Sequence, residues 1–244
     1  MNNADEYIQT YKELEKTVRS IYQLPKEQSI SNFLKNSKRT RLLNIDIEYC
    51  ADVRNLLQHR EKISDEYPVI PTDEMIDYVR SIIDKLNNRP RSHEIAIPKS
   101  KILSATLDSS LRKTMNAMRN TRYTHVPIIE HGKVIGVLSQ SSIFNYIADQ
   151  GIVDIDDELL IKDLKDYLSL KGDDIVIYTF QPSSIFVDEL LEVFEDEFQK
   201  GNRIGMVFLT PNGNPDEELT GILTPWDVLV KSHAIEEEHE QEEK

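Results

Sequence analysis

The sequence predicts an α+β protein in which an N-terminal all-α helical bundle is followed by two α/β modules packed as a pair. Three observations predict it. Apolar residues recur at three- and four-residue spacing over the first part of the chain, which is typical of amphipathic helices. Short runs of β-type residues then alternate with helical segments. This alternation occurs twice in the same order, and such an internal repeat usually marks two similar units that pack together.

Four helices joined by polar loops are expected within residues 1–90. The first ends before Pro25, the second starts at Ser29, and the third covers residues 41–60. The fourth begins after Thr72, whose hydroxyl can cap the first free N–H groups of a helix. The residues expected to form the buried faces are Tyr7, Tyr11, Leu14, Val18 and Ile21 in the first helix, Leu43, Ile47, Cys50, Val53 and Leu57 in the third, and Met75, Val79, Ile82, Ile83 and Leu86 in the fourth. In the third helix, Leu42, Ile45, Tyr49 and Leu56 widen the expected apolar stripe.

Each copy of the repeat reads strand, helix, strand, hairpin, strand, helix. The last strand runs into GVLSQSS at residues 136–142 in the first copy and into GILTPWD at residues 221–227 in the second. The expected boundaries are a bundle at 1–90, a linker at 91–100, a first module at 101–150, a connecting helix at 151–174, a second module at 175–234 and an acidic tail at 235–244.

Composition narrows the class of protein. An apolar content of 39% with only 8 glycines is ordinary for a globular chain, and no apolar run approaches the length needed to span a bilayer. The start of the chain has no basic and then apolar targeting pattern. The single cysteine, Cys50, cannot form an internal disulfide. We therefore expect a cytoplasmic protein with no membrane segment.

The net charge of −14 is unevenly distributed along the chain. Residues 1–98 carry 15 Lys and Arg against 16 Asp and Glu, whereas residues 99–244 carry 14 against 27. Phosphate binding relies on Lys and Arg, so the acidic second part is unsuited to a nucleic acid. The first part is nearly neutral and holds a basic cluster of Lys35, Lys38, Arg39 and Arg41, which leaves RNA open as a partner there.

The repeat resembles the CBS (cystathionine beta-synthase) domain pair over roughly residues 99–233. The resemblance rests on the order of elements and on a signature of Gly, two apolar residues, Ser or Thr, any two residues and Asp. The second copy matches it completely from Gly221 to Asp227, whereas the first copy has Ser142 in place of the acid. CBS pairs typically bind adenosine-containing molecules between their modules. The resemblance therefore implies an adenine nucleotide, such as AMP, ATP or a cyclic dinucleotide, as a regulatory ligand, with no metal.

Carried over residue by residue, the resemblance assigns Asp227 to the ribose and Thr224 to the ribose or phosphate, with Ser139 as the matching hydroxyl in the first module. The starts of the modules, around Ser104 to Thr106 and Tyr178 to Phe180, would line the base pocket. The candidate ligand-binding set is Thr224, Asp227, Ser139, Ser104, Thr106, Tyr178 and Thr179.

The same residues also have a purely structural interpretation. Thr224, Pro225 and Asp227 would cap a helix well without any ligand. Because Ser142 carries no charge, one occupied site per pair is expected. His125 and Arg203 precede central strands and either reach phosphates or are ordinary surface residues.

A second candidate site is RNLLQH, residues 54–59, at the end of the third helix. Within a helical bundle it resembles the Arg-Asn-x-x-x-His motif of HEPN (higher eukaryotes and prokaryotes nucleotide-binding) domains, which include metal-independent endoribonucleases. The resemblance covers roughly residues 3–90 and implies Arg54, Asn55 and His59 as catalytic residues. Histidine suits proton transfer near neutral pH, and a guanidinium suits a phosphate.

Helical geometry limits what one copy of this motif can do. Asn55 and His59 lie on one face at i and i+4, but Arg54 and His59 are about 140° apart around the helix axis. A nuclease would therefore need two chains that face each other, as HEPN sites are built. In the simpler alternative, Arg54 and His59 belong to a solvated basic turn at a helix C-terminus, where the helix dipole favours cations.

The function predicted from the sequence is an adenine-nucleotide sensor whose CBS pair regulates a HEPN-type metal-independent endoribonuclease, acting as a homodimer on RNA. The alternative is a non-catalytic nucleotide-sensing module whose helical domain dimerises or docks a partner protein. Motifs for zinc, for a phosphate loop and for a serine nucleophile elbow do not occur in the sequence.

Overall fold

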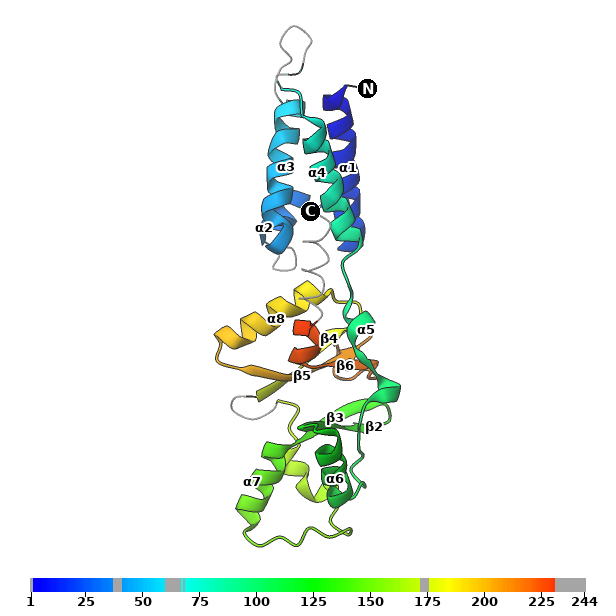
Figure 1. The fold of residues 1–244 in the computed structure, drawn as a ribbon, viewed down its shortest axis with the longest axis vertical. Helices are drawn as coiled ribbons and strands as arrows, with labels where there is room; N and C mark the ends of the chain where they lie inside the picture. The colour runs from blue at the N-terminus through cyan, green and yellow to red at the C-terminus, as the bar shows by residue number, and fades with distance from the viewer. Residues whose placement is uncertain (1, 37–40, 60–66, 68, 172–175, 231–244) are drawn as a thin grey trace. The chain divides into compact units, whose positions relative to one another are not determined.

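The computed structural model describes residues 2–36, 41–59, 67, 69–171 and 176–230 (Figure 1). The chain divides into two compact units, Met1–Arg89 and Pro90–Lys244, which are described separately below. The expected acidic tail at 235–244 lies outside the described residues. Within the described ranges, no helix is both long and apolar enough to cross a membrane.

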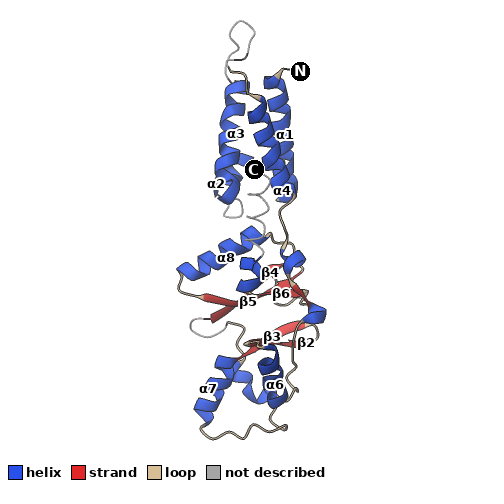
Figure 2. Cartoon of the chain, in the orientation of Figure 1, coloured by secondary structure: helices blue, strands red, loops and turns tan. Residues whose placement is uncertain are grey.

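The first unit is the expected helical bundle (Figure 2). Its helices are α1 (Asn3–Ile21), α2 (Ile30–Asn36), α3 (Arg41–His59) and α4 (Asp73–Asn87). Each contributes apolar side chains to one core, and burying a large aliphatic or aromatic side chain contributes about 1.5–3 kcal/mol. The buried set contains Tyr7, Tyr11, Leu14, Val18, Leu34, Ile47, Cys50, Leu57, Ile76, Val79, Ile82 and Leu86.

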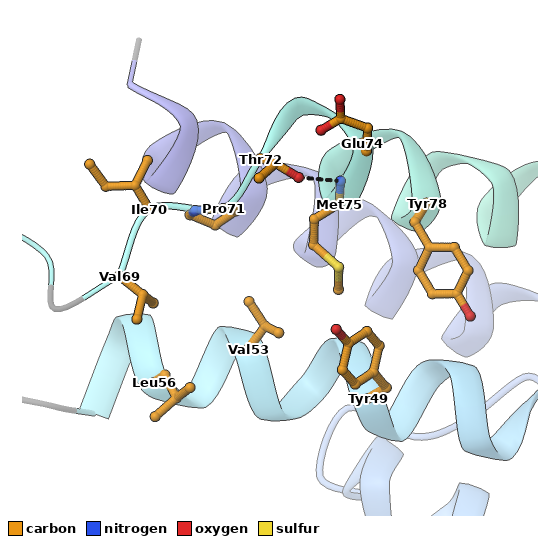
Figure 3. A pocket seen from close by; sticks show the side chains of 10 residues that line it. All are labelled: Tyr49, Val53, Leu56, Val69, Ile70, Pro71, Thr72, Glu74, Met75 and Tyr78. Carbon is orange, nitrogen blue, oxygen red and sulfur yellow. Dashed lines mark hydrogen bonds between the residues drawn. The ribbon is translucent and has the colours of Figure 1, made fainter.

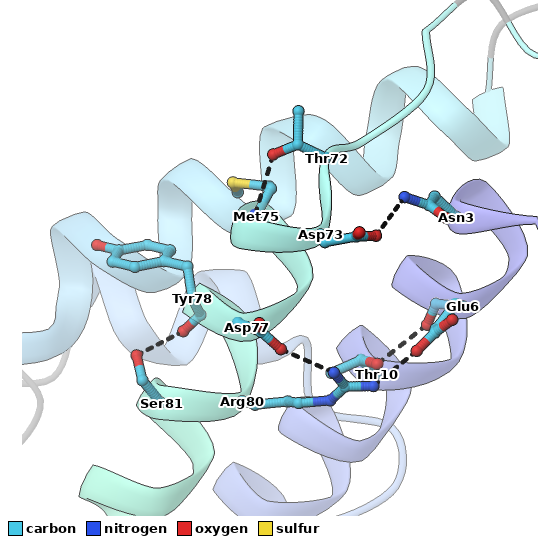
Figure 4. A network of polar contacts seen from close by, with 10 residues as sticks. All are labelled: Asn3, Glu6, Thr10, Thr72, Asp73, Met75, Asp77, Tyr78, Arg80 and Ser81. Atoms are coloured by element: carbon cyan, nitrogen blue, oxygen red, sulfur yellow. Dashed lines mark hydrogen bonds and ion pairs between the residues drawn. The ribbon is translucent and has the colours of Figure 1, made fainter.

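Polar contacts set how α1, α3 and α4 pack. The hydroxyl of Tyr7 donates to the Cys50 carbonyl at 2.8 Å inside the core. Burial raises the pKa of Tyr7 above its usual range and that of the Cys50 thiol to about 11. Figure 4 shows the exposed edge, where Arg80 of α4 bridges Glu6 of α1 at 2.7 Å and Asp77 at 2.8 Å.

The start of α4 confirms the predicted cap. The Thr72 side chain accepts a hydrogen bond from the Met75 N–H at 3.3 Å, and Asp73 and Glu74 follow in the first turn (Figure 4). Asn3 of α1 donates to Asp73 at 2.7 Å, which ties the first turns of α1 and α4 together.

The second unit contains both copies of the repeat. The first copy comprises α6 (Leu111–Thr121), β2 (His125–Glu130), β3 (Lys133–Ser139) and α7 (Gln140–Gln150). The second comprises β4 (Val176–Pro182), α8 (Val187–Gln199), β5 (Arg203–Thr210) and β6 (Gly221–Leu223), and residues 225–230 are helical. In the first copy, a parallel bridge from Ala105 to Ile128 takes the place of the first strand.

Two sheets pack through a shared core. The larger sheet has the order β1-β6-β5-β4, where β1 is Ile97–Pro98, and the smaller one pairs β2 with β3. Val134 and Val137 of the smaller sheet cluster with Met206, Phe208 and Ile222 of the larger. The other face of each sheet is covered by the helices of its own module, α6 and α7 in the first module and α8 with residues 225–230 in the second. The prediction of an α+β chain with paired α/β modules is confirmed.

The expected linker at 91–100 proves to be part of the second module. Ser92 donates its backbone N–H to the Ile185 carbonyl at 2.8 Å and its hydroxyl to the Ser183 carbonyl at 3.0 Å. Further along, β1 pairs with β6 in the register Ile97 to Ile222. This segment contains the short helix α5 (Ser92–Ile95), the edge strand β1 and the start of the 3-10 helix η2 (Lys99–Lys101). Because its backbone groups are bonded to the module, it is not a free linker.

The segment expected to be a connecting helix at 151–174 differs from that expectation. Its helical part is a 3-10 helix, η3, over Ile161–Tyr167. The backbone N–H groups of Ile161 and Lys162 donate at 2.9 Å to the carbonyls of Ser109 and Leu107 in the first module. Asp156 caps the turn before them, accepting from the Glu158 N–H at 2.8 Å. The side-chain cap of Asp156 and the bonds to Ser109 and Leu107 use backbone groups that a continuous α-helix would need, so such a helix does not form.

Candidate functional site

The signature glycines Gly136 of β3 and Gly221 of β6 lie where another segment of the chain crosses the last strand of a module. A Cβ atom added at Gly136 would lie 2.5 Å from the Leu168 carbonyl oxygen, and one added at Gly221 would lie 3.0 Å from the Ile97 carbonyl oxygen. Real Cβ atoms essentially never approach within 2.5 Å of another atom, so only glycine fits at Gly136, whereas a side chain at Gly221 would need its neighbour to shift by a few tenths of an ångström. The repeated glycine therefore serves the crossing of chain segments, and the residues after it are positioned by that crossing.

In the second module, β6 ends directly before Thr224 and Asp227. The Asp227 Oδ2 atom accepts two hydrogen bonds, from the Thr224 N–H and from the Thr224 hydroxyl, both at 2.7 Å. These bonds fix the carboxylate, which is only partly buried. Among the residues that the structure describes, the Oδ1 atom has no hydrogen-bond partner. The arrangement is an oriented carboxylate with one oxygen open to a hydroxyl donor.

The register of the sheet aligns Tyr178 with Thr224, whereas Thr179 is level with Leu223 and, as the next residue of the strand, points to the opposite face. Tyr178 pairs with Met206, and Thr179 pairs with Val207, which in turn pairs with Leu223. Continuing this register by one residue places Thr224 level with Met206 and Tyr178. With about 4.8 Å between strands, Tyr178 and Thr224 lie about 10 Å apart across β5, which is suited to the two ends of a nucleoside. The Tyr178 ring packs on Phe208, with centroids 6.1 Å apart.

The first module has the same local geometry, but its polar groups bond to each other. The Ser139 hydroxyl accepts from the Ser142 N–H at 3.0 Å, and the Ser139 N–H donates to the Ser142 hydroxyl at 3.2 Å. The two hydroxyl groups also bond to each other at 2.9 Å, and both residues are only 7% exposed. Ser142 thus fills the capping role of Asp227, but its polar groups are already paired.

Ser104 and Thr106 are not level with Ser139. Ala105, between them, bridges Ile128, which pairs with Gly136. Gly136 is three residues before Ser139, and at about 3.3 Å per residue this is about 10 Å along the strand. Thr106 is bound in a turn, with its N–H donating to the Ser109 hydroxyl at 3.0 Å. Ser104 is exposed.

His125 and Arg203 lie near the row formed by Tyr178 and Thr224. The His125 ring meets the Tyr178 ring edge to face with centroids 5.8 Å apart, so it contacts the other module. Arg203 is exposed at the start of β5, beside Val176. A basic side chain from each module therefore stands at the end of the sheet where Thr224 lies.

In the bundle, Arg54 is held by its own chain. One guanidinium nitrogen pairs with Glu15 of α1 at 2.6 Å, another donates to the Asn55 side chain at 2.9 Å, and the group lies 5.0 Å from the centre of the Tyr11 ring. The Arg54 side chain is 22% exposed. This placement makes Arg54 part of the packing between α1 and α3, which differs from the solvated basic turn of the simpler alternative.

The other two residues of the motif differ in what the structure describes of them. Asn55 is exposed. His59 is the last residue of α3, and its side chain lies outside what the structure describes. The structure therefore brings Arg54 and Asn55 together, while the third member of the predicted catalytic set stays a prediction.

A feature that sequence reasoning missed is an apolar groove of about 590 Å³ on the bundle surface (Figure 3). It is lined by Tyr49, Val53 and Leu56 of α3, by residues 69–71, and by Met75 and Tyr78 of α4. The Tyr78 hydroxyl donates to Asp46 at 2.7 Å, which raises the pKa of Tyr78 to about 12.

Over the described part of the chain, no group of three or more His, Cys, Asp or Glu side chains is arranged to hold a metal ion.

Taken together, the fold and the site define a tandem pair of α/β modules preceded by a helical bundle. Residues 94–149 match the family model of the CBS domain. The chain therefore contains a CBS domain at this position, and the resemblance seen in the sequence is confirmed there.

Among solved structures, CbpB in complex with c-di-AMP matches with a TM-score of 0.49 and 14% identity, covering 67% of this chain and 99% of that chain. CBSX2 in complex with AMP matches with a TM-score of 0.43 and 15% identity over 60% and 98% of the two chains. A putative acetoin utilization protein, AcuB, from Vibrio cholerae matches with a TM-score of 0.45 and 16% identity over 63% and 97%. No curated protein matches the sequence.

Proposed function

We propose that this protein is a regulatory sensor that binds one adenine nucleotide per chain in the second module of its CBS pair. The observation that carries the proposal is the oriented Asp227 carboxylate. Two hydrogen bonds from Thr224 hold one carboxylate oxygen, and the other is left for ribose hydroxyls. A carboxylate accepts from neighbouring hydroxyls without needing a proton of its own, which suits the ribose diol.

The surroundings of Asp227 support the same ligand class. Tyr178 offers an aromatic ring about two strand spacings away, where an adenine base attached to the bound ribose would lie. His125 and Arg203 supply positive or titratable groups for phosphates at the same end of the sheet. In the first module, Ser139 and Ser142 satisfy each other and are buried, so we expect a single site.

Binding of AMP, ATP and cyclic di-AMP, measured by isothermal titration calorimetry on the whole chain, tests this proposal. Asp227→Asn keeps the oxygen that accepts from Thr224 but removes the charge. A hydrogen bond to a charged group contributes about 1.5–3 kcal/mol, so affinity should fall about 10- to 100-fold. Asp216→Asn, the same change in an exposed loop of the same module, is the matched control and should bind normally. Absence of binding to all three nucleotides, or equal binding by Asp227→Asn, would reject the sensor proposal.

For the bundle, the geometry favours a dimerising or docking role over catalysis. Arg54 is engaged by Glu15 and Tyr11 within its own chain, and an RNA phosphate would have to displace this ion pair. A groove with exposed apolar side chains nearby is the kind of surface that binds another protein. The alternative that we drew from the sequence thereby becomes the preferred proposal for this unit.

Metal-independent RNA cleavage is the second candidate function. The hydrogen bond from Arg54 to Asn55 favours it, because it holds the guanidinium beside the amide that shares a helix face with position 59. Incubation of the protein with mixed RNAs in the presence of a chelator, with and without each nucleotide, is the test. Cleavage that disappears in both Arg54→Ala and His59→Ala would establish the nuclease. Intact RNA under every condition would reject the nuclease and leave the dimerising or docking role for the bundle.

A further inference from the structure

We infer that the outward face of α3 is a self-complementary seam on which α3 of a second copy of this chain packs in antiparallel orientation. This inference deepens the dimerising role proposed for the bundle and does not depend on nucleotide binding. Its basis is a second apolar face on α3, separate from the one in the core. The inward face, formed by Ile47, Cys50 and Leu57, is at most 3% exposed.

The outward face has the spacing of a helix-pairing seam. Ile45, Tyr49, Asp52 and Leu56 follow one another at intervals of four, three and four residues, which is the a and d spacing of a heptad. The sequence spacing placed Ile45, Tyr49 and Leu56 on the apolar stripe of this helix, but in the structure they are exposed by 80%, 56% and 43%. Large apolar side chains at this spacing and exposure predict a partner helix, because such a stripe is otherwise left in water.

Charge determines the orientation of the partner. In a parallel in-register pair, each d position meets its own copy, so two Asp52 carboxylates would face each other in an apolar seam. In an antiparallel pair, a positions meet d positions, so Tyr49 faces Asp52 of the partner subunit and Ile45 faces Leu56 of the partner subunit. Among the described residues, neither the Tyr49 hydroxyl nor the Asp52 carboxylate has a hydrogen-bond partner. Each can therefore bond the other across the seam.

The groove beside α3 fits this arrangement. It is lined by Leu56 together with Val69 and Ile70, which are 42% and 73% exposed. With Ile45 opposite Leu56 of the partner subunit, the most exposed apolar side chain of the seam enters the groove of the other copy. The chain's own C-terminal tail is a poor occupant, because residues 236–244 carry six Glu and the seam itself contains an acid.

The seam also separates the two copies of RNLLQH. In this register, residue 54 of one chain and residue 59 of the other are about 18 Å apart along the axis, at 1.5 Å per residue. A dimer built on this seam therefore does not form a composite site from Arg54 and His59, so its presence and RNA cleavage by a paired motif are separable observations.

Cysteine cross-linking in the whole chain tests the inference. The native Cys50 is 0% exposed and does not interfere. Chains with Ile45→Cys and chains with Leu56→Cys are oxidised separately and as a mixture. We expect a disulfide dimer only in the mixture, because like positions lie about 16 Å apart along the axis and a disulfide needs Cα atoms within about 7 Å. Cross-linking of either variant alone, or none in the mixture, would overturn the inference.

A charge exchange provides an independent readout. Tyr49→Glu places a second carboxylate opposite Asp52 and should weaken dimerisation at least tenfold in sedimentation equilibrium. Adding Asp52→Lys to the same chain should restore it, because the introduced carboxylate would then face a lysine of the other copy. Glu13→Lys, an exposed change on α1, is the control. Dimerisation unaffected by Tyr49→Glu, or occupation of the groove only by a different protein, contradicts the self-pairing seam. Nucleotide affinity should not change in any of these variants.

Discussion

Replacing Gly136 with alanine should strongly destabilise the second unit, Pro90–Lys244. The added Cβ would lie 2.5 Å from the Leu168 carbonyl oxygen and 2.9 Å from the Leu168 Cβ. Leu168 is 5% exposed, and its carbonyl accepts a hydrogen bond from the Val137 N–H at 3.3 Å. The backbone at Leu168 therefore cannot retreat without losing both packing and that bond.

The size of the effect follows from these two losses. Forcing a methyl group into a packed site costs about 1–3 kcal/mol, and the net contribution of one hydrogen bond is about 1 kcal/mol. We expect a loss of about 2–4 kcal/mol, which for a unit of this size lowers Tm by about 4–16 °C. The corresponding change at Gly221, where the oxygen is 3.0 Å away, should cost less, about 1 kcal/mol, since a shift of a few tenths of an ångström relieves it.

Differential scanning calorimetry of the whole chain measures this, with the transition of the second unit followed in each variant. Ser141→Ala, an exposed change on α7 beside the same strand, serves as the control and should be neutral. If Gly136→Ala unfolds within about 1 °C of the unchanged protein, or if Gly221→Ala is the more damaging of the two, the tight crossing at Leu168 is refuted.

Three further predictions concern the caps and the bundle core. Arg54→Met should destabilise the bundle by about 1–2 kcal/mol in urea unfolding, because it removes a partly exposed ion pair and a cation–π contact; an unchanged midpoint would show that Arg54 has no packing role. Burial raises the pKa of Tyr11 to about 12, so its contribution is complete below pH 10 and is lost as pH rises through 12. That loss is about 2–3 kcal/mol. In Tyr11→Phe, the free energy of unfolding measured in urea should therefore fall less steeply between pH 10 and 12. Ser139→Ala should cost about 1 kcal/mol through the α7 cap and leave calorimetric nucleotide affinity unchanged; weaker binding would place a ligand in the first module.

The periodicity of the sequence was sufficient to predict the bundle and the paired modules. The buried faces of α1 and α4 follow three- and four-residue spacing, and Thr72 caps α4 as its position before Asp73 and Glu74 indicates. The repeat identified both signature segments because matching residues recur at matching points. These are local signals, and local spacing is what an amino-acid sequence displays directly.

Contacts between distant segments could not be predicted in the same way. That residues 97–98 pair with β6 depends on hydrogen bonds to a strand far along the chain. The short and irregular helix at 161–167 results from bonds to Ser109 and Leu107, which no pattern within that segment reveals. The sequence indicated an unoccupied first module only through the missing acid at Ser142. The hydrogen bond that pairs the Ser139 and Ser142 hydroxyls is evident only from the structure.

The pairing of β1 with β6 also constrains how this polypeptide is made. Ile97 meets Ile222, so the edge strand β1 and its partner β6 are separated by about 125 residues of chain, and contacts so distant in sequence slow folding. During synthesis the early strand has no partner until nearly the whole second module has left the ribosome. A fragment ending after the first module would leave Ile97 and Pro98 without their partner strand, so the two modules expressed as separate pieces should aggregate more than the joined pair does.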